Sequence, residues 1–458
     1  MRILPAALAL LAGCTYGIKD EPLARWTPAV NQPWVAQIPD GRSDELFVFL
    51  AFSGGGTRAA SFAYGVLQEL AATEIAVEGS RRRLLDEVDV ISSVSGGSFT
   101  AAYYGLFGDR IFTEFEPRFL REDVEGALIT RLLLWPPNWI RLASPTYGRS
   151  DLAADYYDAE LFDGATFRGM LRPGAPFVTI NATDLATGSR FGFTQLYFDY
   201  LCADLQEYPV SRAVAASSAV PVLLSPITLR NFTPACGYPA PPWLVEAAES
   251  EDPRRRTEAR DLLSYGDFEK RKYIHLVDGG IADNVGLRAA FQLVSLQADT
   301  RQTFEYVGHP KPRSILFILV NAESHHDPTF TEEAASPTLG ELIDAVTSDQ
   351  IGHYNFETIE LVSTAFRGWA AQLSSQAEPV EFEFVEVSFD AVRDESQRHA
   401  LNQIGTNFSL DDEEVDLLIG AGRSLLRSSP GYQELVRAWG GTVVEAAGGA
   451  GATGAATP

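Results

Sequence analysis

The chain has little positive charge, few histidines and no long apolar run. Its 458 residues carry 36 Lys and Arg against 61 Asp and Glu, which gives a formal net charge of −25. Such a surface repels phosphate backbones, so we expect no nucleic-acid partner and no binding to anionic lipid by electrostatics alone. No internal stretch reaches the roughly 18 to 20 apolar residues that a membrane-spanning helix needs. With 46% apolar and 21% charged residues, the composition is that of a globular protein with a deep core.

The N-terminus predicts export and lipid attachment. A short basic start, Met1-Arg2, precedes an apolar run that ends in Leu11-Ala12-Gly13-Cys14, which is the order of a secretory signal. Its end resembles the lipobox of bacterial lipoproteins, in which the cysteine is lipidated. We therefore expect a signal peptide over residues 1–13 and acyl chains on Cys14 that hold the protein at a bacterial membrane. Thr15 favours the outer membrane, because Asp is the usual retention signal at that position. A frayed apolar N-terminus is the alternative.

Cysteine is scarce in the remainder of the chain. Only Cys202 and Cys236 follow Cys14. In an exported protein two leftover cysteines predict one disulfide, which would close a loop of about 34 residues and contribute about 3 kcal/mol. Two unpaired thiols in the core are the alternative.

Apolar runs of strand length alternate with helical patterns from residue 45 onwards. The runs predict buried strands at 45–52, 88–92, 177–181, 273–277 and 314–320. Helical patterns occupy 58–72, 98–106, 211–218, 284–297 and 411–426, the last with Ser409 as N-cap. This alternation predicts a three-layer α/β/α fold with a mostly parallel central sheet. We expect a tether over 14–44, one domain over 45–446 with a helical C-terminal part to about 440, and a disordered Gly/Ala tail over 447–458.

Three glycine-marked turns lie where predicted strands end. The first, Gly54-Gly55-Gly56-Thr57-Arg58, can turn backbone N–H groups toward an anion, but it lacks the endings of a P-loop or a dinucleotide fingerprint. The second, Ser93-Val94-Ser95-Gly96-Gly97, has the strand-turn-helix context of a nucleophile elbow, although Ser93 replaces the usual first glycine. The third, Asp278-Gly279-Gly280, delivers a carboxylate from a strand into a turn. Taken singly, the second is also compatible with a plain Ser/Gly-rich turn and the third with a capping Asp.

As an ordered set, the three turns resemble the patatin-like phospholipase family. That family reads Gly-Gly-Gly-x-Arg, then Gly-x-Ser-x-Gly, then Asp-Gly-Gly or Asp-Gly-Ala. Two further segments, 181–188 and 216–221, resemble family blocks that lie between the second and third turns. The resemblance covers about residues 45–290, with weaker likeness to about residue 427, and implies the patatin-like form of the α/β/α fold.

The resemblance also implies a role for each matching residue. Ser95 matches the nucleophile and Asp278 the base of a Ser–Asp dyad without histidine. Arg58 matches a basic position that holds the glycine loop or a lipid phosphate. The expected reaction is attack of Ser95 on an ester carbonyl, stabilisation of the oxyanion by the glycine loop, and hydrolysis of the acyl-enzyme by water. The remaining matches are the oxyanion positions Gly54, Gly55 and Gly56 and the supporting positions Gly97, Gly279 and Gly280.

None of the six histidines has a catalytic context. His275 stands three residues before Asp278 on a predicted strand, so alternation points its side chain away from that carboxyl group. His325 and His326 beside Asp327 are candidate metal ligands, but a solvated loop is the stronger interpretation. The sequence shows no calcium loop, and we expect neither a metal nor a cofactor.

An apolar segment over residues 132–140 bears on the substrate. It contains Trp135 and Trp139, and its two prolines disfavour a regular helix. The segment either lines an acyl channel or touches lipid, because Trp favours membrane interfaces, or it is an ordinary buried segment. We expect a hydrolase of phospholipids or lysophospholipids. The alternatives are a carboxylesterase on other acyl esters and an inactive lipid-binding lipoprotein.

Overall fold

The computed structural model describes residues 18–27, 41–297, 299–325, 336, 339–375 and 378–443. The predicted signal peptide, Cys14 and the predicted Gly/Ala tail lie outside these ranges, as do His326 and Asp327. Within the described ranges, no helix is long and apolar enough to cross a bilayer.

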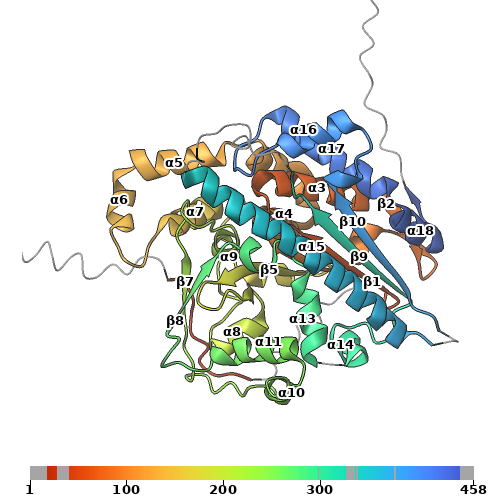
Figure 1. Cartoon of the computed structure of the whole chain (residues 1–458), viewed down its shortest axis with the longest axis horizontal. Helices are drawn as coiled ribbons and strands as arrows, with labels where there is room; N and C mark the ends of the chain where they lie inside the picture. Colours follow the sequence, from red (N-terminus) through yellow and green to blue (C-terminus); the bar gives the residue numbers. More distant parts are fainter. Residues whose placement is uncertain are drawn as a thin grey trace, which may run out of the picture.

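A mixed sheet lies at the centre of the molecule (Figure 1), with the strand order β10-β9-β1-β4-β5-β8-β7 and with β6 paired to β5. The parallel part consists of β10 (Glu381–Ser388), β9 (Ser314–Asn321), β1 (Leu46–Phe52), β4 (Val88–Val94) and β5 (Phe177–Asp184). The antiparallel additions are β6 (Arg190–Gly192), β8 (Tyr273–Val277) and β7 (Ile227–Arg230). The predicted, mostly parallel sheet is therefore confirmed.

Strand β8 departs from the parallel pattern in a way that matters for the site. It runs antiparallel to β5 and pairs only with the end of that strand, with Thr183 opposite Val277 and Asp184 opposite Leu276. Because β8 approaches from beyond the carboxyl edge of β5, its own last residue reaches that edge. The third glycine turn consequently meets the first two even though its strand is reversed.

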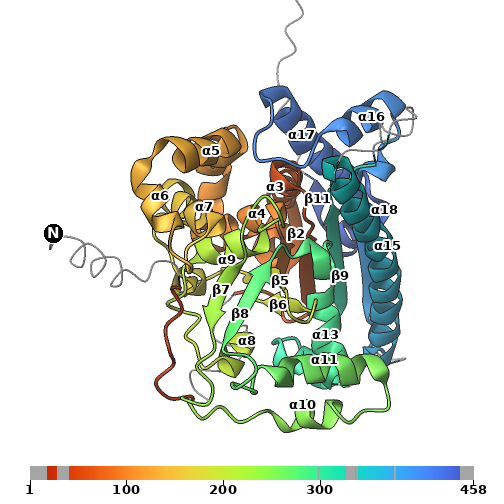
Figure 2. The same ribbon diagram turned by 60° about the vertical axis from the view of Figure 1, so that its left-hand side comes forward.

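Helices cover both faces of the sheet (Figure 2), which makes the three predicted layers. Side chains of β1 alternate between two cores: Leu46 and Leu50 belong to one, and Phe47 and Phe49 to the other. One face is covered by α3 (Gly56–Ala72), α4 (Gly96–Phe107) and α17 (Asp412–Ser428), and the other by α13 (Arg288–Gln297) and α15 (Leu339–Leu373).

The remaining helices and strands lie around this frame. The helices are α5 (Val124–Leu134), α6 (Pro136–Leu142), α7 (Arg149–Tyr157), α8 (Gln195–Tyr200), α9 (Val210–Ser217), α10 (Pro242–Ala247), α11 (Pro253–Ser264), α12 (Gly280–Asp283), α14 (Thr300–Tyr306), α16 (Glu395–Gln403) and α18 (Pro430–Ala438). A small second sheet consists of β2 (Thr73–Val77), β3 (Ser80–Arg83) and β11 (Thr442–Val443). A disulfide joins Cys202 to Cys236, which is the predicted pairing.

Helices α3 and α17 pack with almost no space between their backbones. A Cβ atom added to Gly65 would lie 2.3 Å from the carbonyl oxygen of Ile419, and one added to Gly422 would lie 2.4 Å from that of Phe62. A glycine on each helix therefore permits the contact, and it fixes the C-terminal region against the helix that begins at the first glycine turn.

Three local predictions need correction. The region after residue 320 contains the edge strand β10 as well as helices. Helix α17 is capped by Asp411 rather than Ser409, because Asp411 and Glu414 form a reciprocal capping box. The prolines of segment 132–140 do not prevent helix formation, since Pro136 occupies the first position of α6, where its missing N–H costs nothing.

Candidate active site

The sharp turn between β4 and α4 places Ser95 at the carboxyl edge of the sheet. Ser95 adopts φ 48° and ψ −120° and is the N-cap of α4. A positive φ is costly for a residue with a side chain and persists only where the surroundings enforce it. Here the backbone N–H of Ser95 donates to Ser217 Oγ at 2.8 Å. The conformation is that of a nucleophile elbow, which projects a serine hydroxyl from the end of a strand.

The hydroxyl of Ser95 meets a single carboxyl group. Ser95 Oγ donates to Asp278 Oδ2 at 2.9 Å, and the N–H of Gly280 donates to the other oxygen at 2.8 Å. Burial raises the pKa of Asp278 to about 6, although the bonds from Gly280 and Ser95 act to lower it. At neutral pH the carboxyl group is therefore mostly ionised and close enough to accept the Ser95 proton.

The first glycine turn lies directly against Ser95. A Cβ atom added to Gly54 would lie 2.3 Å from Asn284 Oδ1 and 3.3 Å from Ser95 Cβ. The N–H of Gly54 already donates to the carbonyl oxygen of Asn284 at 2.9 Å. Gly55 and Gly56 have φ values of 136° and 60°, which a side chain would strain. Among the described residues, their two N–H groups donate to no other group, so both are free to bind a ligand.

Close backbone contacts hold the three turns together. A Cβ atom on Gly96 would lie 1.9 Å from the carbonyl oxygen of Gly56, and one on Gly97 would lie 2.7 Å from that of Ser53. In the third turn, a Cβ atom on Gly279 would lie 2.3 Å from the carbonyl oxygen of Asn181. Glycine is thus required at these positions because neighbouring backbone occupies the space of a side chain.

Arg58 is buried and holds the start of α3 in place. Its Nε donates to the carbonyl oxygen of Ala322 at 2.9 Å and its Nη1 to that of Ile404 at 2.6 Å. Burial lowers the pKa of Arg58 to about 10, while nearby Glu323 acts to raise it. These contacts support the glycine-loop interpretation of Arg58 rather than direct phosphate binding.

Several residues that contact the site are not predicted from the sequence. Ser217 Oγ donates to the carbonyl oxygen of Asn181 at 2.6 Å while it accepts from Ser95. The Thr57 N–H donates to the carbonyl oxygen of Asn407 at 2.9 Å. In the sequence, Asn181 and Ser217 are marked only by their positions in segments 181–188 and 216–221, which resemble blocks of the family. Asn407 lies 350 positions after Thr57 in an irregular loop, and no local signal marks it.

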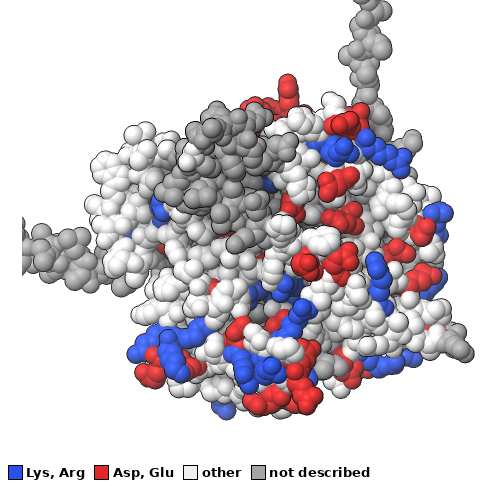
Figure 3. Space-filling model, in the orientation of Figure 1, with Lys and Arg blue, Asp and Glu red and all other residues white. Residues whose placement is uncertain are grey.

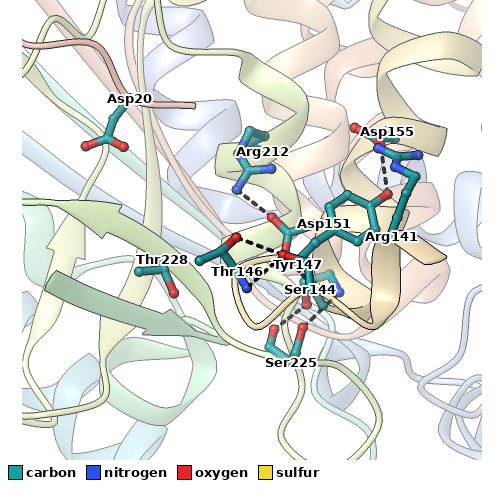
Figure 4. Close-up of polar contacts among 12 residues, drawn as sticks. Asp20, Arg141, Ser144, Thr146, Tyr147, Asp151, Asp155, Arg212, Ser225 and Thr228 are labelled. Atoms are coloured by element: carbon teal, nitrogen blue, oxygen red, sulfur yellow. Dashed lines mark hydrogen bonds and ion pairs between the residues drawn. The ribbon is translucent and has the colours of Figure 1, made fainter. Parts of the chain in front are cut away.

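A polar network behind the site fixes helix α9, which ends at Ser217 (Figure 4). Arg212 of α9 forms an ion pair with Asp151 of α7 at 2.7 Å, and both side chains are buried. The N–H of Ser150 also donates to Ser225 Oγ at 3.2 Å. Helix α7 therefore supports the helix whose last residue positions the Ser95 backbone.

His275 and His325 have partners other than Ser95 and Asp278. The Nδ1 atom of His275 lies 2.9 Å from Thr228 Oγ1, on the side of β8 that alternation predicts. His325 Nε2 lies 3.8 Å from Asp390, and both side chains are exposed. The described ranges contain no group of three or more His, Cys, Asp or Glu residues that could hold a metal ion.

Comparisons with known proteins identify the family and support the fold. A family model described as patatin-like phospholipase matches residues 50–291, which is 242 of the 458 residues. The structure of human GIVD cytosolic phospholipase A2 is similar with a TM-score of 0.50 and 13% identity, over 93% of this chain and 68% of that chain. VipD from Legionella pneumophila gives a TM-score of 0.33 and 12% identity, over 94% and 73% of the two chains. The first of these structures supports the fold. No curated protein sequence matches.

Proposed function

Because this chain belongs to the patatin-like phospholipase family, we propose that it hydrolyses acyl ester bonds of lipids with Ser95 as nucleophile and Asp278 as base. The observation that carries the proposal is the 2.9 Å hydrogen bond from the strained Ser95 to the buried carboxyl group of Asp278. A base within hydrogen-bond reach is what activates a serine hydroxyl. Phospholipids and lysophospholipids are the proposed substrates.

In the proposed reaction, Asp278 accepts the Ser95 proton as the Oγ atom attacks the ester carbonyl. The N–H groups of Gly55 and Gly56 stabilise the oxyanion, and the N-termini of α3 and α4 add positive potential. Gly54 holds the loop through Asn284 instead of donating to the oxyanion, because its N–H is already bonded. Asp278 then returns the proton to the leaving alcohol, and a water molecule cleaves the acyl-enzyme with Asp278 as base again.

The pKa of Asp278 predicts an acid limb in the pH profile. Only its anion can accept the Ser95 proton, so we expect kcat/KM to be level above pH about 6 and to fall tenfold per pH unit below it. The profile is measured between pH 4 and 8 with a short nitrophenyl ester. The folded state binds this proton more tightly than the unfolded state does, so protonation of Asp278 stabilises the fold as the pH falls. Unchanged activity down to pH 4.5 would contradict the role of Asp278.

An exposed apolar surface supports a lipid substrate. Six large apolar side chains on α5, on α6 and between these helices are between 48% and 73% exposed: Ile129, Leu133, Leu134, Trp135, Trp139 and Ile140. The alternative that segment 132–140 is an ordinary buried segment is therefore wrong. Figure 3 shows few charged side chains over this upper left part of the molecule. Val222 and Leu223 are also exposed. They follow closely after Ala219, whose carbonyl oxygen accepts from the Asp278 N–H at 3.0 Å.

We propose that this apolar surface rests on the lipid bilayer from which the substrate comes. The Val222 carbonyl accepts from Arg149 at the start of α7, which ties the loop beside the dyad to the helices α5 to α7. Asp20 accepts from the Arg230 N–H of β7 at 2.8 Å, so the first described residues lie against the strand that follows this loop. Cys14 precedes Ile18 by four residues, at most about 14 Å of extended chain. A lipid anchor on Cys14, at the outer membrane, would hold this surface close to the membrane.

Substitution of the two tryptophans tests the surface. We expect Trp135→Ser with Trp139→Ser to lower hydrolysis of phosphatidylcholine vesicles at least tenfold, because each buried indole contributes about 2 kcal/mol to bilayer binding. Hydrolysis of a soluble nitrophenyl ester should not change. Val245→Ser, an exposed apolar side chain on α10, is the matched control and should affect neither. Equal loss with both substrates would refute the interface.

A further inference from the structure

A large apolar cavity lies on the face of the sheet opposite α3 and α4. Its volume is about 640 Å³, within the range of about 300–1,000 Å³ that is usual for small-molecule sites. Aromatic side chains form much of the wall, among them Phe49 of β1, Phe317 of β9, Trp243 of α10 and Phe304 of α14. Ser95 and Asp278 do not line the cavity, so the cavity is separate from the proposed catalytic site.

A second, polar pocket of about 400 Å³ adjoins the first. Arg254 and Arg288 line the polar pocket but not the apolar cavity. Figure 3 shows side chains of both charges over the lower part of the molecule, where Figure 1 places α11 and α13. The two pockets share five lining residues: Arg190, Tyr197, Leu262, Gln292 and Leu296. The two pockets are therefore neighbours, one apolar and one polar.

Arg190 lies at the junction of the pockets without a carboxylate partner. It is buried and donates to neutral amides, Gln292 Oε1 at 2.9 Å and Asn181 Oδ1 at 2.6 Å. Among the described residues, it forms no ion pair within 4 Å, and neither do Arg254 and Arg288. A buried charge that is satisfied by neutral groups alone favours an anionic ligand.

The lining of the polar pocket holds three arginines against two acids. Glu258 lines the pocket, and burial raises its pKa to about 7 although Arg288, Arg190 and Arg254 act to lower it. Asp261, the other acid in the lining, accepts a hydrogen bond from the Ser189 hydroxyl. With both acids ionised, the lining still holds one more positive than negative group.

We propose that the two pockets together form a non-catalytic site for a long-chain fatty acid anion. The acyl chain occupies the apolar cavity, and the carboxylate lies at the junction near Arg190, with Arg254 and Arg288 beyond it. A methylene group is close in size to a water molecule, about 30 Å³ in the liquid, so a sixteen-carbon chain needs about 480 Å³. The cavity therefore has room for one chain.

Quenching of tryptophan fluorescence by dibromostearate tests the site. The full chain carrying Ser95→Ala is used, so that binding is measured without turnover and independently of the proposed hydrolysis. We expect saturable quenching, because Trp26 and Trp243 line the cavity, and displacement by unlabelled palmitate. Trp243→Phe should remove part of the signal, whereas Trp139→Phe should retain the saturable component.

Two variants and one ligand distinguish this site from general affinity for lipid. Ala290→Phe, which fills the cavity, should weaken binding at least tenfold, and Arg254→Gln about fivefold. Arg260→Gln, on the same helix but outside both pockets, is the control and should bind like the parent. The methyl ester of dibromostearate should bind at least tenfold more weakly. The proposal is overturned if quenching is not saturable, or if it is unchanged in both Ala290→Phe and Arg254→Gln while thermal unfolding shows both to be folded.

Discussion

Ser95→Ala and Asp278→Asn are each expected to lower the hydrolysis of a short nitrophenyl ester by about 10⁴-fold or more, as removal of a nucleophile or its base does in serine hydrolases of known mechanism. Ser95→Ala removes the attacking oxygen. Asp278→Asn keeps the shape of the side chain but removes the charge that accepts the proton. The measurement is kcat/KM at pH 8, above the pKa of Asp278, with the melting temperature recorded for each variant.

Two controls accompany this measurement. The first is a variant of another buried acid, and the second is covalent labelling of Ser95 with a fluorophosphonate. Asp283→Asn removes the charge of another buried acid five residues later, which accepts from the Arg288 N–H and not from Ser95. It should retain most of the activity. Labelling should modify Ser95 in the wild type and be absent from Ser95→Ala. Activity retained by either dyad variant would exclude the dyad, and a wild type that is not labelled would favour a lipid-binding protein without catalysis.

Gly96→Ala is expected to lower kcat by roughly 10²- to 10³-fold, the effect of losing an oxyanion donor. The added Cβ atom would lie 1.9 Å from the carbonyl oxygen of Gly56, so the nucleophile turn and the glycine loop must move apart. The distance between Ser95 Oγ and the Gly55 and Gly56 N–H groups would then no longer suit one tetrahedral intermediate. The measurement is kcat for the nitrophenyl ester together with the melting temperature.

Gly420→Ala is the natural control for that experiment. Gly420 lies within α17, and a Cβ atom added to it meets nothing within 4 Å. Alanine is favoured over glycine in a helix by about 1 kcal/mol, so this variant should be at least as stable as the wild type and fully active. Full activity of Gly96→Ala would show that the two turns do not act together.

The sequence is most informative where a local pattern decides the structure. The apolar runs predict β1, β4, β5 and β9, because a strand buried on both faces has a continuous apolar pattern. The three glycine turns are predicted at strand ends, and the structure brings all three together. Ser93, which replaces a usual glycine, is fully buried and donates to the carbonyl oxygen of Thr179 at 3.3 Å. A hydroxyl that finds a partner explains why serine is tolerated there.

The remainder depends on contacts that no local pattern reveals. The reversed direction of β8 follows from its short pairing with the end of β5, which residue type does not encode. Strand β10 alternates Glu381 and Glu383 with apolar residues, which is typical of an edge strand. The helical patterns on both sides of it predict a mostly helical region instead. The bond from Arg58 to Ile404 spans 346 positions, and single-sequence reasoning cannot place such pairs.

The long-range hydrogen bonds of the glycine loop also determine how much of the chain must be made before the loop is held in place. Ser95 and Asp278 are synthesised in the first two thirds of the chain. The supports of the glycine loop at Ile404 and Asn407, and the contact of Gly65 with α17, come from residues that emerge much later. A nascent chain that ends before residue 404 therefore holds the reactive pair without the groups that keep its oxyanion loop in position. We therefore expect a chain cut before residue 404 to lack the proposed hydrolysis although it contains Ser95 and Asp278.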